Sequence, residues 1–184
     1  MTMTIIDPTI SSAPSPRAGR AQRAPRPSGL DGLRVGLLEN TKRNAAVILD
    51  ALGQGFVEQH GAASLVRRTK KQFALPLSDE LLDDLRAHCD VVVIGVGDCG
   101  SCSAAAVADG IALEAAGVPT AVICTDAFEA TSRAMADIKG DPDYPFVLTA
   151  HPVANLSRPE IDVRAGELLD AAVQRVTLRH KAVA

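Results

Sequence analysis

The chain contains no tryptophan, and aromatic residues make up only 3% of its 184 positions. Proteins that bind single-stranded nucleic acid stack bases on aromatic side chains and carry a basic face. The formal net charge of −3 supplies no such basic excess. No apolar run approaches the ~20 residues that a membrane-spanning helix requires. We therefore expect neither a nucleic-acid partner nor membrane insertion.

Cysteine is also scarce. Four cysteines are too few to form the disulfide framework of a secreted, disulfide-rich protein. The chain starts without the basic-then-apolar pattern of a secretory signal. We therefore predict a cytoplasmic protein in which each cysteine is either structural or reactive.

Residues 7–31 are rich in proline, alanine, serine and arginine and show no periodicity. Such a composition does not bury enough apolar surface to offset the conformational entropy that folding costs. We predict an extended or disordered N-terminal arm over residues 1–31 and one α/β domain over residues 32–184. The arm is either a disordered tail or a segment that wraps a partner subunit through Ile5 and Ile6.

After this arm, short β-branched runs alternate five times with helical stretches. The predicted strands span residues 33–38, 63–68, 90–96, 119–124 and 146–149, and the predicted helices span residues 44–60, 78–89, 102–116, 128–139 and 158–178. Residues 91–94 are apolar at every position, as in a strand covered on both faces. Strict alternation favours a parallel sheet with right-handed crossovers and helices on both faces. We predict a doubly wound, flavodoxin-like or Rossmann-like three-layer sandwich whose five-stranded, mainly parallel sheet has the order 2-1-3-4-5.

In such sheets, ligands bind beyond the carboxyl ends of the strands, near the switch between the first and third strands. The loop after the third predicted strand, residues 95–102, contains three glycines that allow a tight turn. Cys99 falls at or just before the first turn of the next helix, where helix amides stabilise a thiolate. Cys102 follows one helical turn later, the spacing that lets a second thiol resolve a mixed disulfide.

Other interpretations of this Cys-x-x-Cys pair remain open. Cys99 and Cys102 are alternatively two buried, inert thiols, or half of a zinc site completed by Cys124 and His151. A phosphate-binding loop is a weaker alternative, since the G-x-x-x-x-G-K spacing is absent. We predict no metal and no cofactor.

The segment Gly97–Cys102, Gly-Asp-Cys-Gly-Ser-Cys, resembles the signature of the UGSC family of (seleno)proteins, in which the first cysteine position is often selenocysteine. Residues 6–9, 37–45, 117–128 and His151-Pro152 resemble further stretches of that family, so the likeness covers nearly the whole chain. More distantly, the segment is similar to the substrate-binding selenoprotein component of glycine, sarcosine and betaine reductases.

The resemblance implies thiol or selenol chemistry, with Cys99 as the attacking atom and Cys102 as the resolving or assisting thiol. His151 is either a general acid or base near neutral pH or a residue that caps a loop. The predicted substrate-binding residues are Asn40, Lys42, Asn44, Asp98, Gly100, Ser101, Thr125 and Asp126. Among them, Asn40 and Lys42 suit a substrate carboxylate or oxyanion; alternatively, Lys42 is a solvated surface lysine.

Three functions remain open. The first is a thiol-dependent oxidoreductase in which Cys99 attacks a small electrophilic substrate and Cys102 closes a disulfide, which a cellular dithiol then reduces. The second is a non-redox hydrolase, lyase or isomerase that uses Cys99, Cys102 and His151. The third is a subunit that presents substrate to a partner reductase subunit. We expect a small-molecule substrate and a homo-oligomer such as a dimer.

Overall fold

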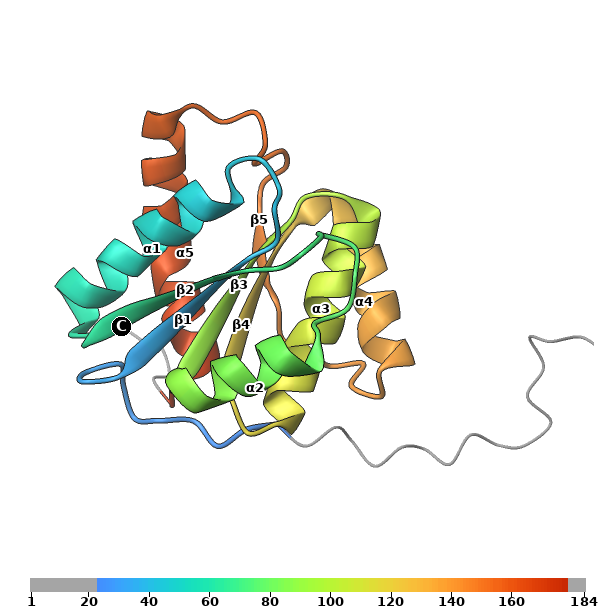
Figure 1. Cartoon of the computed structure of the whole chain (residues 1–184). Coiled ribbons are helices and arrows are strands. Elements are labelled where there is room, and N and C mark those ends of the chain that lie inside the picture. The colour runs from blue at the N-terminus through green and yellow to red at the C-terminus, as the bar shows by residue number, and fades with distance from the viewer. Residues whose placement is uncertain (1–22, 179–184) are drawn as a thin grey trace, which may run out of the picture.

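The computed structural model describes residues 23–178, in which strands and helices alternate throughout (Figure 1). The elements are β1 (Arg34–Glu39), α1 (Ala45–His60), β2 (Ser64–Thr69), α2 (Asp79–His88), β3 (Val91–Gly97), α3 (Gly100–Ala115), β4 (Thr120–Thr125), the 3-10 turn η1 (Asp126–Phe128), α4 (Glu129–Ile138), β5 (Val147–Thr149) and α5 (Arg158–Val176). Every predicted strand and helix is present, and its ends are displaced by no more than two residues.

The five strands form one sheet in the order β2-β1-β3-β4-β5. All four strand pairings are parallel. The predicted α/β class and strand order are therefore confirmed.

β3 lies in the middle of the sheet, and every residue from Val91 to Gly97 is buried. Val91 and Val93 belong to the apolar core under α1 and α5, whereas Val92 and Ile94 belong to the core under α2, α3 and α4 (Figure 1). Because both faces are covered, the strand has no polar alternation. None of the helices within residues 23–178 is long and apolar enough to cross a membrane.

Residues 23–31, the described part of the predicted arm, contact the domain without forming helix or strand. Glu114, buried in the last turn of α3, accepts two hydrogen bonds of 2.7 Å from the guanidinium of Arg26. Its carboxylate also accepts from the backbone N–H groups of Ala24 and Thr120. We call these four residues the amino-end cluster, because they lie where β4 begins. The rest of the predicted arm lies outside the described residues.

The carboxyl ends of β1, β3, β4 and β5 meet at the opposite edge of the sheet. Gly97, the last residue of β3, is in register with Cys124 of β4, and Thr125 is in register with Thr149 of β5. Because parallel strands end at the same edge, the loops that follow them converge there. The predicted site residues lie in these loops, at the end of β4, in η1 or in the first turn of α3.

Candidate active site

Cys99 occupies the N-cap position of α3, within a segment that we call the thiol loop (residues 98–102). Its Sγ accepts a hydrogen bond from the backbone N–H of Cys102 at 3.4 Å, as a capping oxygen does at other helix ends. The hydroxyl of Ser101 lies 3.6 Å from the same sulfur. Cys99 is half-buried and Ser101 is exposed, so the helix end supports a sulfur that solvent still reaches.

The two thiols of this loop differ strongly in acidity. Burial raises the pKa of Cys99, but hydrogen bonds from Cys102 and Ser101 and the positive charge of Lys42 outweigh burial and lower this pKa to about 7. Burial, the hydrogen bond to Cys99 and the negative charge of Cys99 raise the pKa of Cys102 to about 12. At neutral pH, about half of the Cys99 side chains are thiolates, whereas Cys102 keeps its proton.

The Sγ atoms of Cys99 and Cys102 lie 2.7 Å apart, and both residues are free thiols. The Cys102 thiol is thus placed to donate a hydrogen bond to the Cys99 thiolate. An S–S bond measures about 2.05 Å. Closing a bond between these two sulfurs therefore needs only a small side-chain movement.

His151 is held through its Nδ1 atom, which lies 3.0 Å from Asp98 Oδ1 and 3.2 Å from Thr125 Oγ1. The Thr125 hydroxyl donates its own hydrogen to the Gly97 carbonyl at 3.1 Å, so its oxygen accepts from the histidine. Both contacts assign a proton to Nδ1 and leave Nε2 as the acceptor of the neutral ring. The ring of Phe128 packs edge-on against His151, with 5.4 Å between ring centroids.

Asp98, predicted to bind substrate, anchors the loop that follows β5. Its side chain is only 4% exposed. Oδ1 accepts from the backbone N–H of Val153 as well as from His151, and Oδ2 accepts from the N–H of Ala154. Asp126 holds the same loop, since its Oδ1 accepts from the backbone N–H of His151 at 3.0 Å. Both carboxylates therefore position His151.

Asn40 and Asn44, also predicted to bind substrate, are hydrogen-bonded to backbone groups. The buried Asn40 side chain donates to the Val96 carbonyl at 2.9 Å and accepts from the Val96 N–H at 3.1 Å. The Asn44 amide donates to the carbonyls of Val153, Ala154 and Leu156. These contacts use both amides to hold the loops of the site together.

Lys42, by contrast, keeps a charge that no carboxylate neutralises within residues 23–178. Its Nζ lies 4.1 Å from the centroid of the Phe73 ring. Phe73 belongs to the β2–α2 loop and is absent from the predicted site. At Gly100, the nearest atom to an added Cβ would be 4.0 Å away, so the first turn of α3 has open space beside it.

The structure therefore forms two groups at one edge of the sheet. The thiol loop holds Cys99 and Cys102, and the loops after β4 and β5 hold His151 with its side-chain partners. The Asp98–Cys99 peptide bond joins the two groups. Among the described residues, no hydrogen bond links His151 to either thiol.

Comparison with known proteins identifies the family. The sequence model of the UGSC family matches residues 4–178, which include every residue of the site. The chain belongs to the UGSC family. A search of curated proteins finds no match to this UGSC chain.

The prediction of no cofactor takes the G-x-G-x-x-G motif of dinucleotide-binding loops to be absent, which is wrong. Gly95, Gly97 and Gly100 of the UGSC chain have this spacing and lead into α3. In such loops the middle glycine lets the backbone approach a pyrophosphate. Here an added Cβ at Gly97 would lie 2.9 Å from Ser103 Cα and 2.8 Å from Cys124 Sγ. Gly97 therefore faces protein atoms, and the packing does not support a nucleotide site.

The remaining thiols of this UGSC chain, Cys89 and Cys124, are buried. Burial raises the pKa of Cys124 to about 11 and that of Cys89 to about 11. Both therefore stay protonated at neutral pH. Within residues 23–178, no group of three or more His, Cys, Asp and Glu side chains is placed to hold a metal ion.

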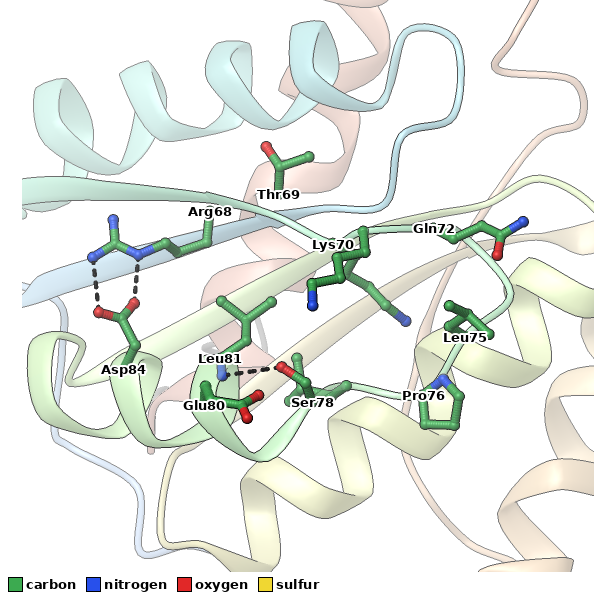
Figure 2. A pocket seen from close by; sticks show the side chains of 12 residues that line it. Arg68, Thr69, Lys70, Gln72, Leu75, Pro76, Ser78, Glu80, Leu81 and Asp84 are labelled. Atoms are coloured by element: carbon green, nitrogen blue, oxygen red, sulfur yellow. Dashed lines mark hydrogen bonds and ion pairs between the residues drawn. The ribbon is translucent and has the colours of Figure 1, made fainter.

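A cavity of about 510 Å³ lies between the β2–α2 loop and α2 (Figure 2). Its lining residues are Arg68, Thr69, Lys70, Lys71, Gln72, Leu75, Pro76, Leu77, Ser78, Glu80, Leu81 and Asp84. Arg68 pairs with Asp84, and Ser78 Oγ accepts from the Leu81 N–H at 3.3 Å. None of the predicted site residues lines this cavity.

Proposed function

We propose that this UGSC protein is a thiol-dependent oxidoreductase that acts on a small substrate with an oxidised, electrophilic sulfur. One observation carries the proposal. The sulfurs of Cys99 and Cys102 lie 2.7 Å apart, yet the pKa of Cys99 is lowered to about 7 and that of Cys102 is raised to about 12. An ionised nucleophile beside a protonated second thiol suits thiol–disulfide exchange.

In the first step, the Cys99 thiolate attacks one sulfur of a substrate disulfide, R–S–S–R′. A bond forms between Cys99 Sγ and the R–S sulfur, the substrate S–S bond breaks, and R′–S⁻ leaves with the bonding electron pair. The Cys102 thiol gives its proton to this leaving group, which departs as R′–SH.

Loss of the Cys99 charge favours this proton transfer. Two of the three causes that raise the pKa of Cys102 are its hydrogen bond to Cys99 and the negative charge of Cys99. Both disappear in the mixed disulfide, so the pKa of Cys102 falls. The Cys102 thiolate then attacks Cys99 Sγ and expels R–S⁻. The protein dithiol is oxidised by two electrons and the substrate disulfide is reduced by two; a dithiol reductant regenerates the protein by the reverse exchange.

A second candidate function depends on His151. Asp98 and Thr125 fix its Nδ1, which leaves Nε2 to accept or donate a proton. This arrangement suits a non-redox hydrolase, lyase or isomerase in which Cys99 forms a covalent intermediate. In such a reaction no bond forms between the two cysteines.

The test treats the reduced full-length protein with one equivalent of 2-hydroxyethyl disulfide, a neutral disulfide, and follows it by intact-mass and peptide mass spectrometry. We expect release of two molecules of 2-mercaptoethanol and formation of a Cys99–Cys102 disulfide. Cys102→Ser should stop at an adduct on Cys99, and the matched control Cys124→Ser should behave like wild type. A wild-type protein that keeps a stable adduct, or reacts first at another cysteine, would contradict the redox proposal.

Once a substrate is found, the Cys102→Ser variant also separates the candidates. A redox cycle stops in this variant, whereas an enzyme that uses Cys99 only as a covalent nucleophile keeps substantial activity. Turnover that appears only after a second protein is added would instead favour a substrate-presenting subunit.

A further inference from the structure

The loop that carries Lys42 is fixed on both sides of this residue. The backbone N–H of Thr41 donates to Glu39 Oε2 at 2.8 Å, and the Asn44 amide binds carbonyls of residues 153–156. Thr41 and Asn44 have positive φ angles of 63° and 67°, so the chain turns sharply on either side. The backbone of Lys42 is thereby held at the same edge of the sheet as the thiol loop.

The ammonium group of Lys42 rests on an aromatic face, with Nζ 4.1 Å from the centroid of the Phe73 ring. The loop of Phe73 is itself anchored to α3. Lys70 forms a buried ion pair with Asp109, which also accepts from the Leu77 N–H at 2.8 Å. Both partners of this cation–π contact are thus held by the fold.

This contact holds the ammonium without neutralising it. An aromatic face attracts a cation through its quadrupole and carries no net negative charge. Two basic side chains of the β2–α2 region do have carboxylate partners: Arg68 pairs with Asp84, and Lys70 pairs with Asp109. Within residues 23–178, Lys42 has no such partner. Its charge therefore remains available to an anion.

The positive charge of Lys42 can offset the negative charges at and beside Cys99. Asp98 adjoins Cys99 in the chain, and Cys99 is itself ionised near neutral pH. An anionic substrate would meet the repulsion of both groups on its way to the sulfur. The positive charge of Lys42 lowers the pKa of both Cys99 and Cys102, so it acts where the reaction takes place.

We infer that Lys42, seated on Phe73, is the anion receptor of the active site, and that the substrate carries a carboxylate or similar anionic group close to the sulfur that Cys99 attacks. The inference rests on the proposed function, because it takes Cys99 as the nucleophile. Phe73 is a positioning residue that acts through Lys42.

Two alkylating reagents of similar size test this inference on the full-length protein. Iodoacetamide is neutral and iodoacetate carries a carboxylate; each forms an S–C bond with the Cys99 thiolate and releases iodide. The ratio of their rate constants at one pH cancels the fraction of Cys99 that is ionised. What remains is the preference of the site for a negatively charged reagent, read at Cys99 by peptide mass spectrometry.

Lys42→Met is expected to lower the iodoacetate-to-iodoacetamide ratio about three- to tenfold, the effect of removing one partly screened positive charge. Phe73→Leu should lower the ratio in the same direction by a smaller factor. Lys42→Arg should keep the ratio within about twofold, because a guanidinium also stacks on an aromatic face. The matched control is Lys71→Met, which removes the same charge from the cavity of Figure 2 and should leave the ratio unchanged.

An unchanged ratio in Lys42→Met, with Cys99 still reactive toward iodoacetamide, would overturn the anion receptor and leave the thiol chemistry standing. A Cys99 that reacts with neither reagent faster than an unstructured cysteine peptide would overturn the proposed function instead. Circular dichroism verifies that each variant is folded. If Lys42→Met does not fold, the ratio measured for Phe73→Leu decides the question.

Discussion

Charged side chains at the two ends of the parallel sheet are partnered differently. At the amino end, the buried carboxylate of Glu114 accepts four hydrogen bonds, two of them from the Arg26 guanidinium. At the carboxyl end, the Cys99 sulfur is partly ionised, and the Lys42 ammonium and the Nε2 atom of His151 have no hydrogen-bond or ion-pair partner among the described residues. Polar groups that stabilise a fold are paired, whereas groups that meet a ligand stay available.

Breaking the amino-end cluster should have the largest effect on stability. Glu114→Ala leaves the Arg26 guanidinium without its carboxylate and should lower the free energy of unfolding by about 3–5 kcal/mol. Chemical denaturation measures this loss. The control Asp50→Ala breaks an exposed pair with Arg67 and should cost less than about 1 kcal/mol. Equal losses in the two variants would contradict the contrast between the ends.

Filling the space at Gly97 should have the next largest effect. In Gly97→Ala the new methyl group meets Ser103 Cα at 2.9 Å, a backbone atom that cannot move freely. We expect a loss of about 1–3 kcal/mol in the free energy of unfolding, measured by denaturation. Gly166→Ala is the control, because no atom lies within 4 Å of its added Cβ, and it should not destabilise the protein. A Gly97→Ala protein as stable as wild type would show that this packing does not fix the start of α3.

The ionisation of Cys99 should couple stability to pH. The folded chain holds the pKa of Cys99 at about 7, below its ordinary value of 9.0. A lowered pKa adds stability that is fully present above the ordinary value and is lost as the pH falls through the folded value. Relative to Cys99→Ser, wild type should therefore gain up to about 2 kcal/mol between pH 7 and pH 9. A difference that stays constant over this range would argue against a stabilised thiolate.

The smallest predicted effect concerns the proton on His151. Nitrogen NMR of the neutral ring should show the hydrogen on Nδ1, where Asp98 and Thr125 accept it. Thr125→Val removes one of the two acceptors and keeps a side chain of similar volume. It should raise the fraction of the Nε2–H form without unfolding the chain. If the Nε2–H form were the main species in wild type, the assignment of the proton to Nδ1 and of the acceptor role to Nε2 would be wrong.

The fold could be predicted because local signals agree with one another. Val91–Ile94 reads as a strand covered on both faces, and Gly61 ends α1 with a positive φ of 70°. Ser78 caps α2 by accepting from the Leu81 N–H. The thiol loop could also be predicted, because its cysteines directly follow such a strand at the spacing of one helical turn.

The supporting residues of the site could not be predicted, because their partners are distant in the sequence. Nothing near Asn40 indicates that it will bind Val96, and nothing near Asp98 indicates that it will bind the N–H groups of Val153 and Ala154. An Asn or Asp after a strand is typical of ligand contact, so the sequence favours that interpretation. The sequence around Phe73 contains no motif that indicates a role at the site, since that role depends on the contact of Phe73 with Lys42.

The most direct measurement is the pH dependence of Cys99 alkylation by iodoacetamide, read separately for each cysteine by peptide mass spectrometry. If the amides of α3, the Cys102 thiol and Lys42 stabilise the thiolate, the rate at Cys99 should be half-maximal at about pH 7. Cys89 and Cys124 should stay unreactive up to about pH 11. A half-maximal rate near pH 9.0, the ordinary value for a cysteine, would contradict the account.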